Sequence, residues 1–491
     1  MPLSGRRSGV LLHPTSLPGP HGAGDLGPAA WRCVEWLARA GQTLWQWLPT
    51  TPLGPGDSPY QSLSAFAGDP GLVALEPLVE AGWLRADLAP PAFAADRCEH
   101  GRAGAWRLER LRQALRGHDA RATAADREAF ERWCAAQRHW LDDYARFMAL
   151  RTQHGNAPWW AWPGGARPEP AEVRYWRFVQ WCFDVQLQAL RRHAHAHGVH
   201  LVGDLPIFIA HDSADVWARR DLYQLDAAGQ PTVVAGVPPD DLGPLGQRWG
   251  NPLYRWDRMA AEGHAWWIAR MRRLLEQVDA VRIDHFRGFA AHWEIPAASP
   301  TAQQGRWVEG PGRSLFDAMT AALGPMPILA EDLGYITPDV LALRDAYGYP
   351  GMKILQFAFG TDGTHEFLPH NYAANCVVYT GTHDNDTARG WWDHAPEHER
   401  RYAATYLDCD ADSVAWQMVA AASRSVARLA ISPLQDLLGL PSTSRLNTPG
   451  TLGPSNWTWR LQAEQLDARL ADRLARLTAA AGRCDIGRLH G

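Results

Sequence analysis

Three short apolar runs each lead into an acidic residue, and these acids are the first candidates for chemistry. The runs end in Ile283-Asp284, in Ala330-Glu331 and in Thr380-Gly-Thr-His-Asp384. If the runs are parallel strands of one barrel, their acids reach the mouth at the carboxyl ends of the strands, where barrel enzymes build their active sites. We therefore expect Asp284, Glu331 and Asp384 to converge. The alternative is that each acid only caps the helix that follows its strand.

Carboxyl groups that converge in this way suit the cleavage and re-formation of glycosidic bonds. Retaining glycosyl transfer needs an ionised carboxylate as nucleophile and a protonated carboxyl group as acid and then base, about 5–5.5 Å apart. Arg282 lies two residues before Asp284, so both point to the same side of a strand and Arg282 can keep that acid ionised. Glu331 has no cation within two residues, which suits a raised pKa and an acid/base role. Asp384 is then suited to binding sugar hydroxyls and stabilising positive charge.

The elements that would position these acids form a regular pattern. Strand-length apolar runs alternate with segments of helical periodicity, which is typical of a (β/α)8 barrel, the α/β fold also called a TIM barrel. We expect one such barrel over residues 1–491. Its eight strands are predicted at residues 9–13, 43–48, 200–206, 280–284, 327–331, 352–357, 376–380 and 427–431.

Two segments interrupt the pattern. About 150 residues separate the second strand from the third, far more than one crossover requires. The intervening residues 76–197 are rich in Ala, Arg, Leu and Trp with helical periodicity, so we expect a large, mostly helical insertion there. Residues 229–251 are dense in Gly and Pro, which predicts an irregular loop subdomain at the carboxyl-terminal face of the barrel.

Several distinctive motifs are spread over nearly the whole chain. They are Gly9-Val-Leu-Leu-His-Pro-Thr-Ser-Leu-Pro-Gly19, Gly56-Asp-Ser-Pro-Tyr-Gln-Ser62, Gly203-Asp-Leu-Pro-Ile-Phe208, Gly246-Gln-Arg-Trp-Gly-Asn-Pro-Leu-Tyr254, Arg282-Ile-Asp-His-Phe-Arg-Gly288, Ala330-Glu-Asp-Leu-Gly334, Thr382-His-Asp-Asn385, Asn447-Thr-Pro-Gly450 and Asn456-Trp-Thr-Trp459. Together these motifs resemble those of the amylomaltase, or 4-α-glucanotransferase (disproportionating enzyme), family of the α-amylase superfamily.

The resemblance implies roles for individual residues. Asp284 matches the family's nucleophile, Glu331 the acid/base and Asp384 the transition-state stabiliser. It further implies sugar contacts at Ser58, Tyr60, Asp204, Trp249, Arg282, His285, His383 and Asn447. The implied reaction transfers α-1,4-glucan segments from maltooligosaccharides to the 4-hydroxyl group of glucose or another glucan, through a covalent glucosyl-enzyme and without a cofactor.

One departure from the family bears on the outcome of the reaction. The resemblance implies that residues 229–251 cover the substrate and favour a sugar acceptor over water. The family commonly has a Tyr-Phe pair after Pro-Pro-Asp, whereas Asp241 and Leu242 stand here. An α-1,4-glucan hydrolase that uses the same acids is therefore an alternative, as are a catalytically silent glucan-binding protein and a metal-dependent barrel hydrolase.

Composition excludes other classes. The formal net charge is −5 and we find no basic patch in the sequence, which disfavours nucleic acid. No run approaches the roughly 18 uncharged apolar residues of a membrane span, so no membrane partner is expected. Seven scattered cysteines without a Cys-x-x-Cys pair, and no signal-peptide core, predict a cytoplasmic protein. The sequence does not predict an oligomeric state.

A histidine-rich stretch is the one candidate metal site in the sequence. His193 and His197 are spaced one helical turn apart, and His195 and His200 lie close by. No carboxylate or cysteine near them in the sequence completes a ligand set, and histidines in the last turn of a helix are favoured by its dipole. We therefore predict no metal site.

Overall fold

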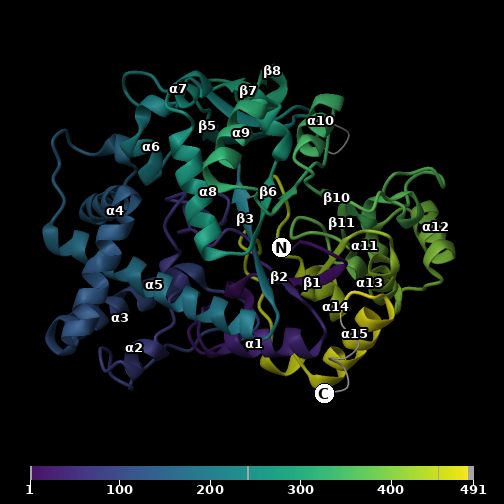
Figure 1. The fold of residues 1–491 in the computed structure, drawn as a ribbon, viewed down its shortest axis with the longest axis horizontal. Coiled ribbons are helices and arrows are strands. Elements are labelled where there is room, and N and C mark those ends of the chain that lie inside the picture. Colours follow the sequence, from purple (N-terminus) through teal and green to yellow (C-terminus); the bar gives the residue numbers. More distant parts are fainter. Residues whose placement is uncertain (1–2, 240–242, 452, 485–491) are drawn as a thin grey trace.

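The central element is a parallel sheet of eight strands that curls into a barrel (Figure 1). The computed structural model describes residues 3–239, 243–451 and 453–484. Around the sheet the strands follow the order β10-β11-β12-β1-β2-β3-β6-β9, and the backbone N–H of Ala330 donates to the carbonyl oxygen of Pro350 at 3.0 Å where β9 meets β10. The strands are β1 (Arg7–Leu11), β2 (Leu44–Gln46), β3 (His200–Pro206), β6 (Ala280–Asp284), β9 (Ile328–Ala330), β10 (Gly351–Ile354), β11 (Cys376–Tyr379) and β12 (Leu429–Pro433). The predicted (β/α)8 barrel is confirmed.

Strand composition explains why these segments form a barrel. Helices cover a parallel barrel outside and side chains fill it inside, so its strands read as continuous apolar runs. Inside, apolar residues such as Val202, Ala280 and Leu329 pack into one buried cluster. Because side chains alternate along a strand, Arg282 and Asp284 point to the same side as Ala280. The apolar floor of the barrel therefore lies directly below two charged residues.

Helices surround the sheet (Figure 1). Pro28 at the first position of α1 suits a helix start, because proline lacks the N–H that would be unbonded there. The helices that follow or flank the barrel strands are α1 (Pro28–Arg39), α6 (Ala214–Ala218), α7 (Trp256–Ala261), α8 (Ala265–Gln277), α9 (Gly312–Leu323), α10 (Pro338–Ala346), α11 (Ala388–His394), α12 (Glu397–Leu407), α13 (Val414–Arg424), α14 (Leu434–Leu437) and α15 (Ala468–Ala480). No described helix is long and apolar enough to cross a membrane.

The long segment between β2 and β3 consists mostly of helices on one side of the barrel (Figure 1). They are α2 (Glu76–Glu80), α3 (His100–Arg121), α4 (Ala124–Gln153) and α5 (Pro170–Ala196). Thr123 starts α4 in a capping box with Asp126, each side chain bonding the other's backbone N–H. The last helix, α5, packs against α4 but also against α1, α8 and β3. It therefore serves both the insertion and the outer ring of the barrel.

A second, antiparallel sheet differs from the irregular loop that the sequence suggested. Its order is β5-β4-β7-β8, with β4 (Val233–Val237), β5 (Gln247–Pro252), β7 (Ala291–Pro296) and β8 (Arg306–Glu309). Gly236 lets β4 and β5 approach closely, because a Cβ there would lie 2.1 Å from the carbonyl oxygen of Gln247. The glycines that suggested a loop thus permit a hairpin. Asp241 and Leu242, at which the chain departs from the family, lie outside the described residues.

Candidate active site

Arg282 joins two carboxylates inside the mouth of the barrel. It pairs with Asp204 of β3 in the parallel register of β3 and β6. Its Nη1 lies 2.7 Å from Asp204 Oδ2 and 3.0 Å from Asp284 Oδ1. Burial lowers the pKa of Arg282, but Asp204 and Asp284 outweigh it and hold that pKa well above its ordinary value. The side chain of Asp204 is fully buried whereas that of Asp284 is 27% exposed, so Asp284 is the more accessible of the two.

Glu331 follows β9 and is held from two sides by backbone. His285 N–H donates to Glu331 Oε2 at 2.6 Å, and Leu333 N–H donates to Oε1 at 2.9 Å. Burial raises the pKa of Glu331 and the charge of Asp284 adds to this, while Arg282 and the two N–H donors oppose it. A carboxyl group that keeps its proton at neutral pH suits a general acid.

Backbone strain at His285 supports this arrangement. His285 directly follows Asp284 and adopts a left-handed conformation with φ 54° and ψ 48°, which is uncommon for a residue other than glycine. Such strain persists where the surrounding structure enforces it, often at active sites. The turn aims the His285 N–H at Glu331. Burial, with Arg287 and His292, lowers the pKa of the imidazole to about 3, so the ring is neutral.

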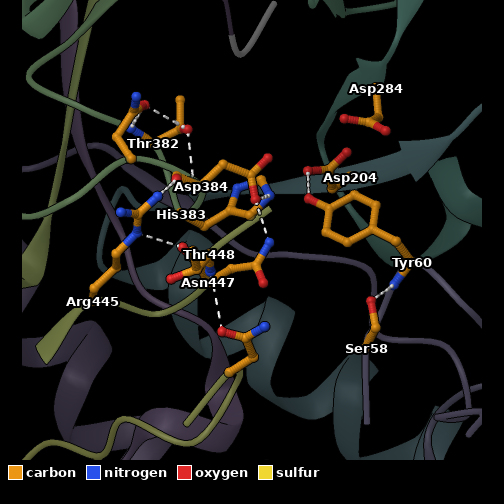
Figure 2. A network of polar contacts seen from close by, with 12 residues as sticks. Ser58, Tyr60, Asp204, Asp284, Thr382, His383, Asp384, Arg445, Asn447 and Thr448 are labelled. Carbon is orange, nitrogen blue, oxygen red and sulfur yellow. Dashed lines mark hydrogen bonds and ion pairs between the residues drawn. The ribbon is translucent and has the colours of Figure 1, made fainter. Parts of the chain in front are cut away.

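Asp384 lies across the mouth and is positioned by the segment after β12 (Figure 2). Asn447 Nδ2 donates to Asp384 Oδ1 at 2.6 Å, and His383 Nε2 lies 3.4 Å from the same oxygen. Arg445 binds the backbone carbonyls of Asp384 and Asn447, each at 2.7 Å. The side chain of Asp384 is 42% exposed, so it remains accessible to a ligand.

Aromatic side chains connect the group of Asp204, Arg282 and Asp284 to Asp384 on the other side of the mouth. Tyr60 donates its hydroxyl to Asp204 Oδ2 at 2.8 Å, as Figure 2 shows, and its ring stacks on His383 with centroids 5.2 Å apart. Ser58 Oγ accepts from the Tyr60 N–H at 3.3 Å. Trp249 of β5 meets His285 edge to face at 4.9 Å. Flat aromatic faces of this kind bind the apolar faces of sugar rings.

All of the predicted site residues belong to one connected set. Contacts run from Ser58 through Tyr60, Asp204 and Arg282 to Asp284, from there to His285, Glu331 and Trp249, and from Tyr60 through His383 to Asp384 and Asn447. Their individual roles stay predictions. The three groups of described His and acid side chains close enough to share a metal ion contain none of them.

Sequence reasoning missed two residues of the site. Trp457 packs against Tyr60 and His383 with ring centroids 5.9 and 6.0 Å away, and has a positive φ of 65°. Trp457 stands within a motif that resembles the family, and this motif could have identified Trp457 as a site residue. Arg445 had no signal of this kind, because it acts on backbone carbonyls that only the fold brings to it.

Comparisons with known proteins all indicate one family. A family model described as 4-alpha-glucanotransferase matches residues 12–466. The chain is 49% identical to a 4-alpha-glucanotransferase of Thermus thermophilus, over 97% of this chain and 99% of the relative. It is 44% identical to one of a Synechocystis species, over 98% and 99%. A solved amylomaltase from Streptococcus agalactiae, in complex with acarbose, matches with a TM-score of 0.93 and 35% identity over 98% of this chain and 100% of that one.

Fold and site together define a barrel enzyme whose mouth carries the carboxyl groups and aromatic rings needed for reactions at glycosidic bonds. The similarity to these relatives narrows this class of enzyme to one family. The chain belongs to the 4-alpha-glucanotransferase family and is an enzyme that transfers glucan segments.

Proposed function

We propose that the transfer proceeds by double displacement with retention at the anomeric carbon. The Asp284 carboxylate attacks that carbon while Glu331 gives its proton to the leaving 4-oxygen, which forms a glucosyl ester and releases the shortened glucan. Glu331 then removes the proton from the acceptor's 4-hydroxyl group as that oxygen displaces Asp284. The observation that carries this proposal is the combination of an Asp284 bound by Arg282 with a half-buried Glu331 of raised pKa.

Asp384 is proposed to stabilise the positive charge that develops on the sugar ring. Asn447 and His383 both approach Oδ1, and the side chain is 42% exposed. Oδ1 is therefore fixed by the protein, and the carboxylate remains open toward hydroxyl groups of the substrate. Two further buried atoms, Asp204 Oδ1 and His285 Nε2, have no hydrogen-bond partner among the described residues. Buried polar atoms are normally satisfied, so these support binding of sugar hydroxyls.

Donors are proposed to be α-1,4-glucans and maltooligosaccharides, with glucose among the acceptors. Support comes from the names of the relatives and from the aromatic ring of Tyr60, on which a pyranose ring would stack.

The three carboxyl groups suffice for the chemistry, so we propose that no cofactor takes part. We propose that neither nucleic acid nor a membrane is involved. We also propose a cytoplasmic location, which the buried thiols of Cys33, Cys98 and Cys182 support.

Trapping the glucosyl-enzyme tests the mechanism. In Glu331→Gln, maltosyl fluoride should still react, because fluoride leaves without a proton, whereas the second step lacks its base. A covalent maltosyl adduct should accumulate on Asp284 and be located by peptide mass spectrometry. Asp284→Asn should form no adduct, and Asp339→Asn, which changes an exposed acid outside the site, should keep normal turnover. An adduct on another residue, or substantial turnover by a folded Asp284→Asn variant, contradicts the proposal.

A further inference from the structure

A group of possible metal ligands lies on the outer wall of the barrel, away from the active site. His193 lies in the last turn of α5, His197 is the residue that caps the carboxyl end of that helix, and Glu35 lies on the neighbouring helix α1. One ligand atom from each lies within 4.8 Å of the others, and His193 Nε2 is 3.5 Å from Glu35 Oε1. Sequence reasoning omitted a metal here because it considered only acids close to the histidines along the chain.

The surroundings of the two imidazole rings indicate which nitrogen of each could reach an ion. His197 Nδ1 lies 2.9 Å from the carbonyl oxygen of His193 and carries the proton of that hydrogen bond, which leaves Nε2 as the nitrogen that could bind an ion. Metal-binding histidines commonly donate their other N–H to such an oxygen. His193 Nε2 is buried without a hydrogen-bond partner among the described residues.

We propose that Glu35, His193 and His197 bind one first-row transition metal ion such as Zn²⁺, with water completing its coordination. Two imidazole nitrogens and a carboxylate suit this class of ion better than Ca²⁺ or Mg²⁺, which prefer oxygen ligands. A tetrahedral ion with bonds of roughly 2.0–2.2 Å holds its ligands about 3.3–3.6 Å apart. His193 and Glu35 already have this spacing. The Glu35 side chain is 55% exposed, so it is free to adjust around an ion.

The adjacent group of similar composition is occupied by the protein's own cation. His195, His200 and Asp279 also lie within reach of one another. Arg191, however, donates to Asp279 Oδ1 at 3.0 and 2.7 Å, and the N–H of Leu201 donates to Oδ2 at 2.8 Å. An ion there would have to displace a guanidinium group. This second group therefore provides a matched control on the same helix.

The position of the proposed metal site indicates what a bound ion would do for the protein. The end of α5 leads directly into the start of β3, so the site lies at the amino-terminal end of the barrel, opposite the mouth. Residues at this end of a barrel serve stability rather than chemistry. An ion shared by α1 and α5 would join two helices of the outer wall and stabilise the folded state, because the unfolded chain does not hold the ligands together.

Metal titration of the full chain tests the proposal. The protein, without an affinity tag and stripped by a chelator, is titrated with Zn²⁺ in a calorimeter and with Co²⁺ by visible absorption. We expect one equivalent to bind and to raise the melting temperature. Glu35→Gln and His197→Gln should each weaken this binding by about tenfold or more. His195→Gln, the control, should bind as the parent does.

The variants also separate the alternatives. Glu35 is exposed and His197 half-buried, so both replacements should fold, as circular dichroism and glucan transfer will verify. The proposal is overturned if the parent protein binds no equivalent of either ion. It is equally overturned if Glu35→Gln and His197→Gln bind like the parent, or if His195→Gln loses the binding while they keep it.

Discussion

Arg282 is the residue on which the charges of the active site depend. It is the one cation in direct contact with both Asp204 and Asp284 among the described residues, and it also influences Glu331. The two acids that we propose do the chemistry differ in their surroundings. Asp284 contacts the guanidinium group of Arg282, whereas burial is the largest influence on the pKa of Glu331. Such a difference in environment is what assigns distinct roles to two carboxyl groups.

The pH dependence of turnover should show the loss of the Glu331 proton. Its pKa is raised, and the first step needs its protonated form, so activity on maltotriose should persist at neutral pH and fall as the pH rises through that pKa. Release of fluoride from maltosyl fluoride needs no proton and should lack this fall. Glu331→Gln should lose about 10²- to 10⁴-fold on maltotriose.

The control for the pH experiment is Glu294→Gln, which changes a buried acid that pairs with Arg306 in the antiparallel sheet. It should keep the pH profile of the parent. An equal alkaline fall with maltotriose and with maltosyl fluoride would mean that the titrating group is not the acid of the first step.

At the scale of elements, the hairpin of β4 and β5 sets the position of Trp249. Gly236 pairs with Arg248, the residue before Trp249, and Trp249 in turn packs against His285. Part of the site therefore stands on a sheet outside the barrel. The sequence did not predict this sheet, because β8 is short and only partly buried and because the glycines of β4 and β5 are typical of loops.

Gly236→Ala should disturb the site through this hairpin. The added Cβ would meet the carbonyl oxygen of Gln247, and overpacking of this kind costs about 1–3 kcal/mol of stability. A small displacement of Trp249 should lower kcat/KM on maltotriose roughly 10- to 100-fold. Gly104→Ala is the control, since its Cβ would enter open space. A lower melting temperature with unchanged kcat/KM would show that the hairpin does not position Trp249.

At the scale of the molecule, the barrel and the acids at its mouth were predictable for two reasons. Buried parallel strands are apolar along their whole length, and barrel strands deliver their last residues to a common face. Features that depend on contacts between distant segments were not predictable. They are the hydrogen bond from Arg445 to the backbone of Asp384, the packing of α5 against both the insertion and the barrel, and the position of Glu35 beside His193. No local periodicity reports on these.

The most direct test of the whole account is the fate of maltotriose. The purified protein is incubated with it, products are separated by size over time, and reducing ends are counted. Transfer predicts glucose together with maltooligosaccharides longer than the substrate, while the number of reducing ends stays constant. Rising reducing ends with only shorter products would mean that water is the preferred acceptor, and would contradict the account.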